Sequence, residues 1–240
     1  MEIVCQLAAK VLQHAQKLVQ PGYTTQQIND ELHELTLSLG CESAPLNYHG
    51  FPKSICTSIN DVVCHGVPSP TDILMPGDSV NIDVTLKKDG FFGDTSRTFF
   101  VGEVTDNAKR LADCAQKSMY AGIEAIKAGK FNTDVGRATL SVIKDMGFFP
   151  VLDIGGHGIG KAFHMDPFVP AHMNVPKERL IKNTCITVEP MVNETSSKYN
   201  TLKVPGSSIA AYKTIDGTLS AQFEHTILVT SAGYEILTEW

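Results

Sequence analysis

The sequence predicts an α+β fold made of two similar halves. Each half opens with two helical segments and continues with strands, an order that differs from the alternation of a βαβ protein. Acidic residues interrupt apolar strands in both halves. At 240 residues, 42% hydrophobic and 19% charged, the chain can bury a sizeable core. We therefore expect one domain over residues 1–240, with pseudo-repeat halves at about 1–104 and 105–240.

The first half is expected to begin with a helix over about residues 2–19, whose apolar residues recur at helical spacing. A second helix is expected over about residues 25–39. It starts at Thr24-Thr-Gln-Gln27, a capping-box pattern, and ends at Gly40. Strands are then expected near residues 54–60, 79–87 and 91–101.

The second half repeats this order. Helices are expected over about residues 106–128 and 133–146, each closed by a glycine, Gly129 and Gly147. The strands that follow are expected near residues 148–153, 163–169, 184–192, 209–214 and 220–230. Because the order of elements occurs twice, we expect the acidic strand pairs of the two halves to meet at the centre.

The strongest local signal is Asp89-Gly90, because a type I′ hairpin turn needs positive φ at both central residues. If these two residues form the loop, Asp94 lies opposite Thr85 and Asp83 lies opposite Ser96. Both carboxylates then share one face of the hairpin, about 7–8 Å apart at their Cβ atoms. The other face carries three residues expected in the core, Ile82, Val84 and Leu86.

Two like charges on one face repel each other unless a cation lies between them. The alternative is a hairpin whose polar face lies in water. The second half favours the cation, because Glu189 and Glu224 each interrupt a β-branched, apolar run. A carboxylate in such a run is rarely buried unless it is paired or binds a metal.

Between these acidic pairs lies His157, flanked by glycines in the segment Ile154-Gly-Gly-His-Gly-Ile-Gly160. Glycine removes Cβ bulk and permits close backbone approach, which suits an imidazole that reaches into a crowded site. A glycine-flanked histidine is also typical of a turn, and that alternative stays open. Four acidic residues and one histidine match the oxygen-rich ligand set of a two-metal hydrolytic centre.

At this point the sequence resembles a known family over nearly its whole length, the methionine aminopeptidases of bacterial type I. The matching stretches are YHGFPKS (48–54), CTSINDVVCHG (56–66), the hairpin of Asp83 and Asp94, GHGIG (156–160), FH (163–164), TVEPM (187–191) and SAQFEH (220–225). The resemblance implies the pita-bread fold, in which two pseudo-symmetric halves, each a helix pair with an antiparallel sheet, surround a dinuclear metal site. It also implies a metallo-exopeptidase that removes the initiator methionine from nascent proteins and peptides when the second residue is small.

The resemblance also implies the roles of site residues. The metal ligands map onto Asp83, Asp94, His157, Glu189 and Glu224, in the order of the family. Two divalent ions (Co, Mn, Fe or Zn) are the implied cofactors, since carboxylate-rich sites accept all of them. They lower the pKa of a shared water, whose hydroxide attacks the scissile carbonyl with Glu189 as general base. His164 is similar to the family histidine that stabilises the oxyanion, and His65 to the one beside the substrate nitrogen. A turn histidine is the alternative for His65.

A slot for the methionine side chain is implied as well, since sulfur packs well against aromatic rings. By resemblance it is lined by Tyr48, Phe51, Cys56, His65, Phe163 and His164. For Tyr48 and Phe51 the alternative is ordinary core packing. The chain departs from the family pattern twice. Ala210 or a neighbour stands where a tryptophan is usual, and Met165, with Asp166 next, stands where an acidic residue usually follows the second histidine. We expect a wider or differently lined rim.

Other classes fit the sequence less well. Prolidases and X-Pro aminopeptidases share the metal core but resemble longer proteins, and only about 40 residues precede the catalytic stretch here. A non-catalytic binding protein on this fold would be expected to have lost ligands. Type II enzymes carry a helical insertion for which the stretch from Glu189 to Glu224 leaves no room. Nor is there a zinc-ribbon or polyproline extension of the eukaryotic type I kind.

Composition indicates the setting. The net charge of −6 is spread without long runs, which argues against a nucleic-acid surface. No stretch approaches the ~20 apolar residues that span a bilayer, and no secretory signal is present. The six cysteines form no CxxC pair, which favours reduced thiols in a cytoplasm. We expect a cytoplasmic monomer whose substrates are N-terminal Met peptides and nascent chains close to the ribosome.

Overall fold

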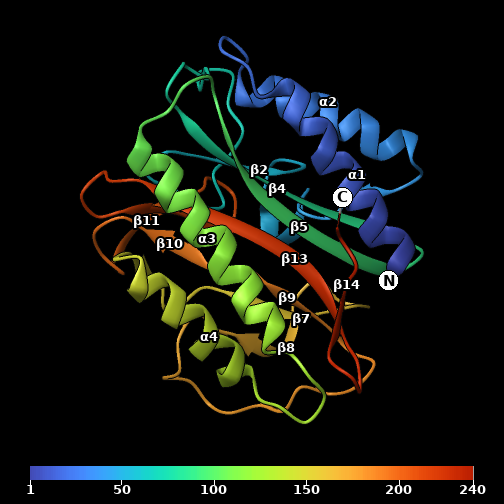
Figure 1. The fold of residues 1–240 in the computed structure, drawn as a ribbon. Helices are drawn as coiled ribbons and strands as arrows, with labels where there is room; N and C mark the ends of the chain where they lie inside the picture. Colours follow the sequence, from blue (N-terminus) through green and yellow to red (C-terminus); the bar gives the residue numbers. More distant parts are fainter. Residues whose placement is uncertain (240) are drawn as a thin grey trace.

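The computed structural model describes residues 1–239; Trp240, the single tryptophan of the sequence, lies outside them. A long twisted sheet runs through the molecule, with one helix pair packed on each half (Figure 1). The helices are α1 (Glu2–Leu18), α2 (Thr25–Ser38), α3 (Asp106–Glu124) and α4 (Asn132–Asp145), with a short 3₁₀ turn at Tyr48–Gly50. The expectation of two helix pairs is confirmed.

The start of α2 agrees with the expectation from the sequence, whereas the end of α3 differs from it. The capping box at α2 is formed, with the Thr24 hydroxyl accepting from the Gln27 N–H and the Gln27 side chain accepting from the Thr24 N–H. The expected end of α3 near residue 128 is wrong, because this helix stops at Glu124. The N–H groups of Ala128 and Gly129 donate instead to the carbonyls of Thr230 and Leu180. Long-range hydrogen bonds therefore replace the last helical turn.

The strands form a main sheet in the order β1-β4-β5-β13-β9-β7-β8, to which β2, β6, β10 and β14 are added, and a small sheet β11-β12-β3. The strands of the first half are β1 (Glu42–Ser43), β2 (Cys56–Ile59), β3 (Val62–Cys64), β4 (Ser79–Lys88) and β5 (Phe91–Phe100). Those of the second half are β6 (Phe149–Pro150), β7 (Gly156–Ile159), β8 (Met165–Val169), β9 (Cys185–Val188), β10 (Met191–Asn193), β11 (Tyr199–Lys203), β12 (Ala210–Thr214), β13 (Ser220–Val229) and β14 (Tyr234–Ile236).

The one strand expected near residues 184–192 is wrong, because it is broken into β9 and β10 at Glu189 and Pro190. Proline has no N–H for a ladder, and the two pieces pair differently: β9 lies between β7 and β13, whereas β10 lies between β6 and β13. Phe163 and His164 precede β8 instead of opening it. The short strands β1, β3, β7, β11 and β14 were not expected from the sequence.

The acidic hairpin has the register that the sequence predicts. Asp89 and Gly90 both have positive φ, 52° and 78°, as a type I′ turn requires. Thr85 lies opposite Asp94 and Asp83 opposite Ser96. Both aspartates therefore lie on one face of β4 and β5.

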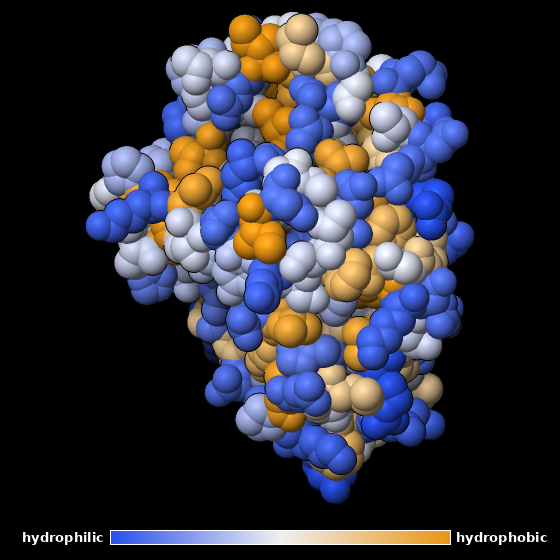
Figure 2. All heavy atoms as spheres, turned by 90° about the vertical axis from the view of Figure 1, so that its left-hand side faces the viewer, coloured by the Kyte–Doolittle hydropathy of each residue, from blue (hydrophilic) through white to orange (hydrophobic). Residues whose placement is uncertain are grey.

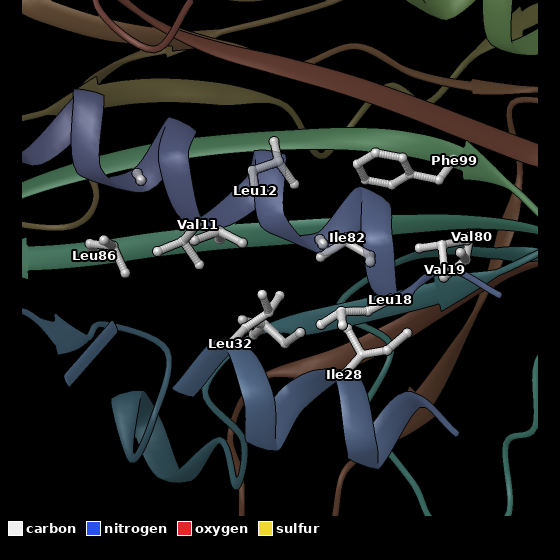
Figure 3. Close-up of a cluster of buried hydrophobic side chains, with 14 of the residues drawn as sticks. Val11, Leu12, Leu18, Val19, Ile28, Leu32, Val80, Ile82, Leu86 and Phe99 are labelled. Carbon is white, nitrogen blue, oxygen red and sulfur yellow. The ribbon is translucent and has the colours of Figure 1, made fainter. Parts of the chain in front are cut away.

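The other face of the hairpin packs against the first helix pair. Ile82 and Leu86 are at most 1% exposed, and they belong to the core of the first half together with Leu12 of α1 and Leu32 of α2 (Figure 3). Because side chains alternate along a strand, helices on one face leave the opposite face to the polar residues.

The second half repeats this division on β13. Its buried apolar residues Phe223, Ile227 and Val229 belong to the core formed with α3 and α4. Glu224, in alternate register, points to the opposite face, as Asp94 does on β5. β5 and β13 pair directly, with Glu224 opposite Ser96. The acidic residues of the two halves therefore meet at the central strand pair.

The segment that follows β14 connects the second half to the first. Leu237 follows β14 and is buried in the core of the first half. The Gln6 side chain of α1 donates to the Leu237 carbonyl at 2.8 Å. The segment around Leu237 and the first helix therefore lie side by side (Figure 1).

The surface and the cysteines have the character that the composition indicates. Over residues 1–239, no helix is both long and apolar enough to cross a membrane. On the face in Figure 2, hydrophobic residues lie in separate groups among hydrophilic ones. All six cysteines are buried and free of disulfide bonds.

Replacing Gly93 by alanine should destabilise the protein. A Cβ at Gly93 of β5 would lie 2.8 Å from the Cys5 nitrogen and 2.9 Å from its Cα, both main-chain atoms of α1, so the whole helix would have to move. Overpacking of this kind costs about 1–3 kcal/mol, which lowers the melting temperature by roughly 2–4 °C per kcal/mol in a chain of this size. Gly233→Ala is the control, because its nearest neighbour would lie 3.8 Å away. Equal melting temperatures for the two variants would contradict this account.

Candidate metal centre

One cavity of about 480 Å³ opens on the acidic face of the central strands. All the residues that the sequence singled out for a site line it together. They are Tyr48, Phe51, Cys56, His65, Asp83, Asp94, His157, Phe163, His164, Glu189 and Glu224. The structure thus brings both halves of the predicted site into one cavity.

Potential metal ligands converge at one end of this cavity. One ligand atom each of Asp94, His157 and Glu224 lies within 4.8 Å of the others. The His157 Nε2 atom is 3.5 Å from a Glu189 carboxylate oxygen and 3.9 Å from an Asp94 oxygen. Asp83 follows on the same face of the hairpin. Four carboxylates and one imidazole therefore surround a common volume.

Burial in this volume opposes charge on every ligand candidate. Burial raises the pKa of Asp83 to about 7, and burial with the neighbouring Asp83 charge raises that of Glu189 to about 8. The pKa values of Asp94 and Glu224 are raised as well, first by burial and then by the other carboxylates. Burial lowers the pKa of His157 to about 4, which keeps its imidazole neutral and able to bind a metal.

The residues present fit divalent cations. Within residues 1–239, the buried atoms Oδ1 of Asp83 and Oε1 of Glu224 have no hydrogen-bond partner. Buried carboxylate oxygens without partners are costly, and hard cations satisfy such oxygens while reversing the repulsion among the carboxylates. The ligand set, with oxygen donors and one nitrogen, suits metals of the Mn, Fe, Co and Zn group.

Neighbouring polar residues orient these carboxylates, although none of them was expected from the sequence to be a site residue. Thr85 donates to Asp94 at 2.6 Å, Thr187 to Glu189 at 2.9 Å, and the Gln222 amide to Glu189 at 3.1 Å. Each lies two residues from an acidic residue on a strand or at its end, so the period of two would have found all three.

The glycines beside His157 are required by close backbone approach, as expected. A Cβ at Gly156 would lie 2.3 Å from the Thr187 carbonyl oxygen, and one at Gly158 would lie 2.1 Å from that of Asp166. His157 stands on β7, a strand and not a turn. Its N–H donates to the Thr187 hydroxyl at 2.9 Å, which fixes the histidine beside Glu189.

Aromatic rings form the other end of the cavity. The ring of Tyr48 lies 4.9 Å from that of Phe163 and 5.4 Å from that of His164, centroid to centroid. Phe51 is 1% exposed and Cys56 is 8% exposed, so both contribute buried wall. The cavity therefore has aromatic walls at one end and carboxylates at the other.

Two further histidines have fixed partners. The His65 Nδ1 atom donates to the Ala210 carbonyl at 3.1 Å, which leaves Nε2 as an acceptor. The His164 Nδ1 atom is 3.0 Å from the Tyr48 hydroxyl. Burial lowers the pKa of His65, and burial followed by the neighbouring His157 lowers that of His164 to about 3. Both imidazoles are therefore neutral near pH 7.

The remaining wall of the cavity comes from other segments of the chain. It is formed by Pro45, His49, Thr85, Asp153, Ile154, Gly155, Phe168, Ser208, Ile209, Ala210 and Tyr212. The small Ala210 lies on this wall. Ala210 or a neighbour stands where the family pattern has a tryptophan. The sequence could not predict that these other wall residues line the cavity, because they reach it only through tertiary contacts.

A cavity with buried carboxylates, a neutral imidazole and aromatic walls, at the place where the two halves of the main sheet meet, is typical of a metal-dependent hydrolase. A family model described as Metallopeptidase family M24 matches residues 1–231. The chain therefore belongs to metallopeptidase family M24, in its methionine aminopeptidase group.

The relatives support this membership over most of their length. Methionine aminopeptidase A of Synechocystis is 47% identical over 234 residues, which cover 97% of this chain and 91% of that protein. In the crystal structure of methionine aminopeptidase from Rickettsia prowazekii, the chain has 43% sequence identity to this one. The two structures superpose with a TM-score of 0.94 over 99% of this chain and 95% of the other. The pita-bread fold expected from the sequence is thus confirmed. Prolidase from Pyrococcus furiosus shares the fold alone, at 20% identity and a TM-score of 0.78 over 100% of this chain and 62% of the other.

Proposed function

We propose that this protein is a methionine aminopeptidase that removes the N-terminal initiator methionine from peptides and nascent chains when the second residue is small. The observation that carries the proposal is the convergence of five potential metal ligands and an aromatic slot in one cavity. The identity to methionine aminopeptidases, 47% with the Synechocystis protein, supports the same substrate class.

Two divalent ions would be held by Asp83, Asp94, His157, Glu189 and Glu224. Asp94 and Glu224 would contribute carboxylate oxygens from the two central strands, one from each half. Asp83, Glu189 and the His157 imidazole would complete the set of ligands. When bound, such ions lower the pKa of water and polarise a peptide carbonyl. Co, Mn, Fe and Zn all suit the ligand set.

Three residues would carry the proton transfers and hold the peptide. Glu189 acts as the general base and passes the proton on to the leaving amine. The Tyr48 hydroxyl, by donating to Nδ1, places the proton of His164 on Nε2, from which it donates to the substrate carbonyl as negative charge develops. His65 keeps Nε2 as an acceptor for an N–H of the substrate.

The methionine side chain would occupy the slot of Tyr48, Phe51, Cys56, His65, Phe163 and His164. Its thioether packs against aromatic rings, and its lack of branching fits a narrow space. A prolidase activity is less well supported, because the Pyrococcus furiosus prolidase shares only 20% identity with this chain.

We also propose the setting of the enzyme. Residues 1–240 form one catalytic domain with halves at about 1–104 and 105–240, joined at β5 and β13. The protein acts as a cytoplasmic monomer close to the ribosome, without binding nucleic acid or membranes. The net charge of −6 and the free cysteines support this setting.

Peptide hydrolysis tests the function. We expect Met-Ala-Ser and Met-Gly-Ser to be cut well and Met-Leu-Ser or Met-Lys-Ser poorly, because Tyr48, His65 and His164 crowd the space beside the carboxylates. Forcing a branched side chain into such a space costs about 1–3 kcal/mol, or 10- to 200-fold in kcat/KM. The discrimination should be milder than in an enzyme with a bulky residue at the position of Ala210 or a neighbour.

The control peptides are Leu-Ala-Ser, which tests the first residue, and Met-Pro-Ser, which tests the second. Equal kcat/KM for Met-Ala-Ser and Met-Leu-Ser would mean that the crowding is absent. The protein would then be a broader aminopeptidase.

A further inference from the structure

Thr226 lies where β13 changes its neighbour along one edge. Before it, Phe223 and Glu224 pair with β5, whereas residues 227–229 pair with β14. The main chain of Thr226 is occupied by the C-terminal segment: its N–H donates to the Thr238 hydroxyl at 3.1 Å, and its carbonyl accepts from the Leu237 N–H at 2.9 Å. The N–H and the carbonyl of Thr226 therefore bond to the C-terminal segment and are not available to β5.

The Thr226 side chain takes over the pairing with β5. The register of the two strands places Thr226 opposite Asp94. The Thr226 hydroxyl donates to the Asp94 carbonyl at 2.7 Å and accepts from the Asp94 N–H at 3.2 Å. Thr226 is 0% exposed and Asp94 is 4% exposed, so water does not compete for these hydrogen bonds. A single side chain thus holds both main-chain groups of Asp94.

A matching arrangement lies at the other end of the same strand pair. There the Thr98 hydroxyl donates to the Gln222 carbonyl at 2.8 Å and accepts from the Gln222 N–H at 3.1 Å. The hydrogen bonds are of the same kind, but Gln222 is not one of the five potential metal ligands, and only its side-chain amide contacts one of them, Glu189. Thr98 therefore provides a control in which the same pair of hydrogen bonds holds a neighbour of the ligands instead of a ligand.

We propose that Thr226 is a positioning residue of the metal centre. Glu224 and Thr226 lie two residues apart on one face of β13, so the hydroxyl ties the main chain of Asp94 to the strand that carries Glu224. It thereby sets the separation of the two carboxylates that come from opposite halves. The inference rests on the proposed metal site and adds a residue that does not touch the metal.

The test is titration of the metal-free full-length protein with Mn²⁺ by calorimetry. Thr226→Val keeps the shape and removes both hydrogen bonds, and we expect it to raise the Kd for Mn²⁺ about 10- to 100-fold, as loss of an orienting partner does. Thr226→Ser keeps the hydroxyl and should bind as the wild type does. Thr98→Val should lower the melting temperature of the metal-free protein and should raise the Kd less than Thr226→Val does, because Gln222 is a neighbour of the ligands and not a ligand.

Three outcomes would overturn the proposal: an unchanged Kd in Thr226→Val, an equal loss in Thr98→Val, or an equal loss in Thr226→Ser. If Thr226→Val does not fold, judged by circular dichroism, Thr226→Ala against Thr226→Ser gives the same comparison. A wild-type protein that binds no Mn²⁺ would instead refute the metal site itself, so the two failures are distinguishable.

Discussion

Removing divalent ions with a chelator should abolish hydrolysis of Met-Ala-Ser and lower the melting temperature by about 10 °C. The temperature shift follows because ions present at about 1,000 times their Kd stabilise the folded state by about 4 kcal/mol, and each kcal/mol moves the melting temperature by roughly 2–4 °C. Activity disappears because no other group of the site can lower the pKa of water and polarise the peptide carbonyl as the cations do. Peptide assays and scanning calorimetry, with metal content from elemental analysis, measure both effects.

The pH dependence of the metal-free protein gives an independent check. The folded-state pKa values of Asp83 and Glu189, about 7 and about 8, are raised above the ordinary 3.8 and 4.5. The protonated carboxyl groups therefore contribute fully to the free energy of unfolding below about pH 4. This contribution is lost as pH rises through about 7 to 8. The metal-free protein should melt at lower temperature at pH 8 than at pH 5, and Mn²⁺ should raise the melting temperature more at pH 8. Full activity in a verified metal-free sample would contradict the proposed mechanism.

His164→Ala should lower kcat for Met-Ala-Ser by about 10²-fold or more while the protein keeps its metal. The neutral imidazole, held by the Tyr48 hydroxyl, is expected to donate to charge that develops on the substrate carbonyl. An interaction of this kind strengthens in the transition state, so kcat falls more than KM rises. Steady-state kinetics with metal analysis measures the change.

His14→Ala on α1 is the control, because this histidine lies beside Lys10 and Lys17 at a different surface. It should keep the kinetics of the wild type. A His164→Ala protein that loses metal but keeps its activity per bound metal would show that His164 is a ligand or a scaffold residue instead.

Much of the fold could be predicted because the signals are local. Asp89-Gly90 specifies its hairpin through positive φ at both residues, and the period of two then places Asp83 and Asp94 on one face. The capping box at Thr24 likewise depends only on residues within one turn of α2.

The parts that could not be predicted depend on long-range hydrogen bonds. The end of α3 at Glu124 is decided by the carbonyls of Thr230 and Leu180, more than fifty residues further along the chain. The break of the strand at Glu189 is decided by different partners for β9 and β10. In both places the local pattern favours a longer element, and the tertiary partners shorten it.

The sequence by itself determined which residues could serve the site, because side-chain chemistry and strand periodicity are properties of the chain. Only the tertiary structure decided how they meet. β5 and β13 bring Asp94 and Glu224 together across the two halves, and loops distant in sequence, such as the one ending at Ala210, complete the cavity. The Thr226 hydroxyl shows the same division: the sequence supplies a threonine, but its hydrogen bonds to Asp94 exist only because the C-terminal segment occupies its main chain.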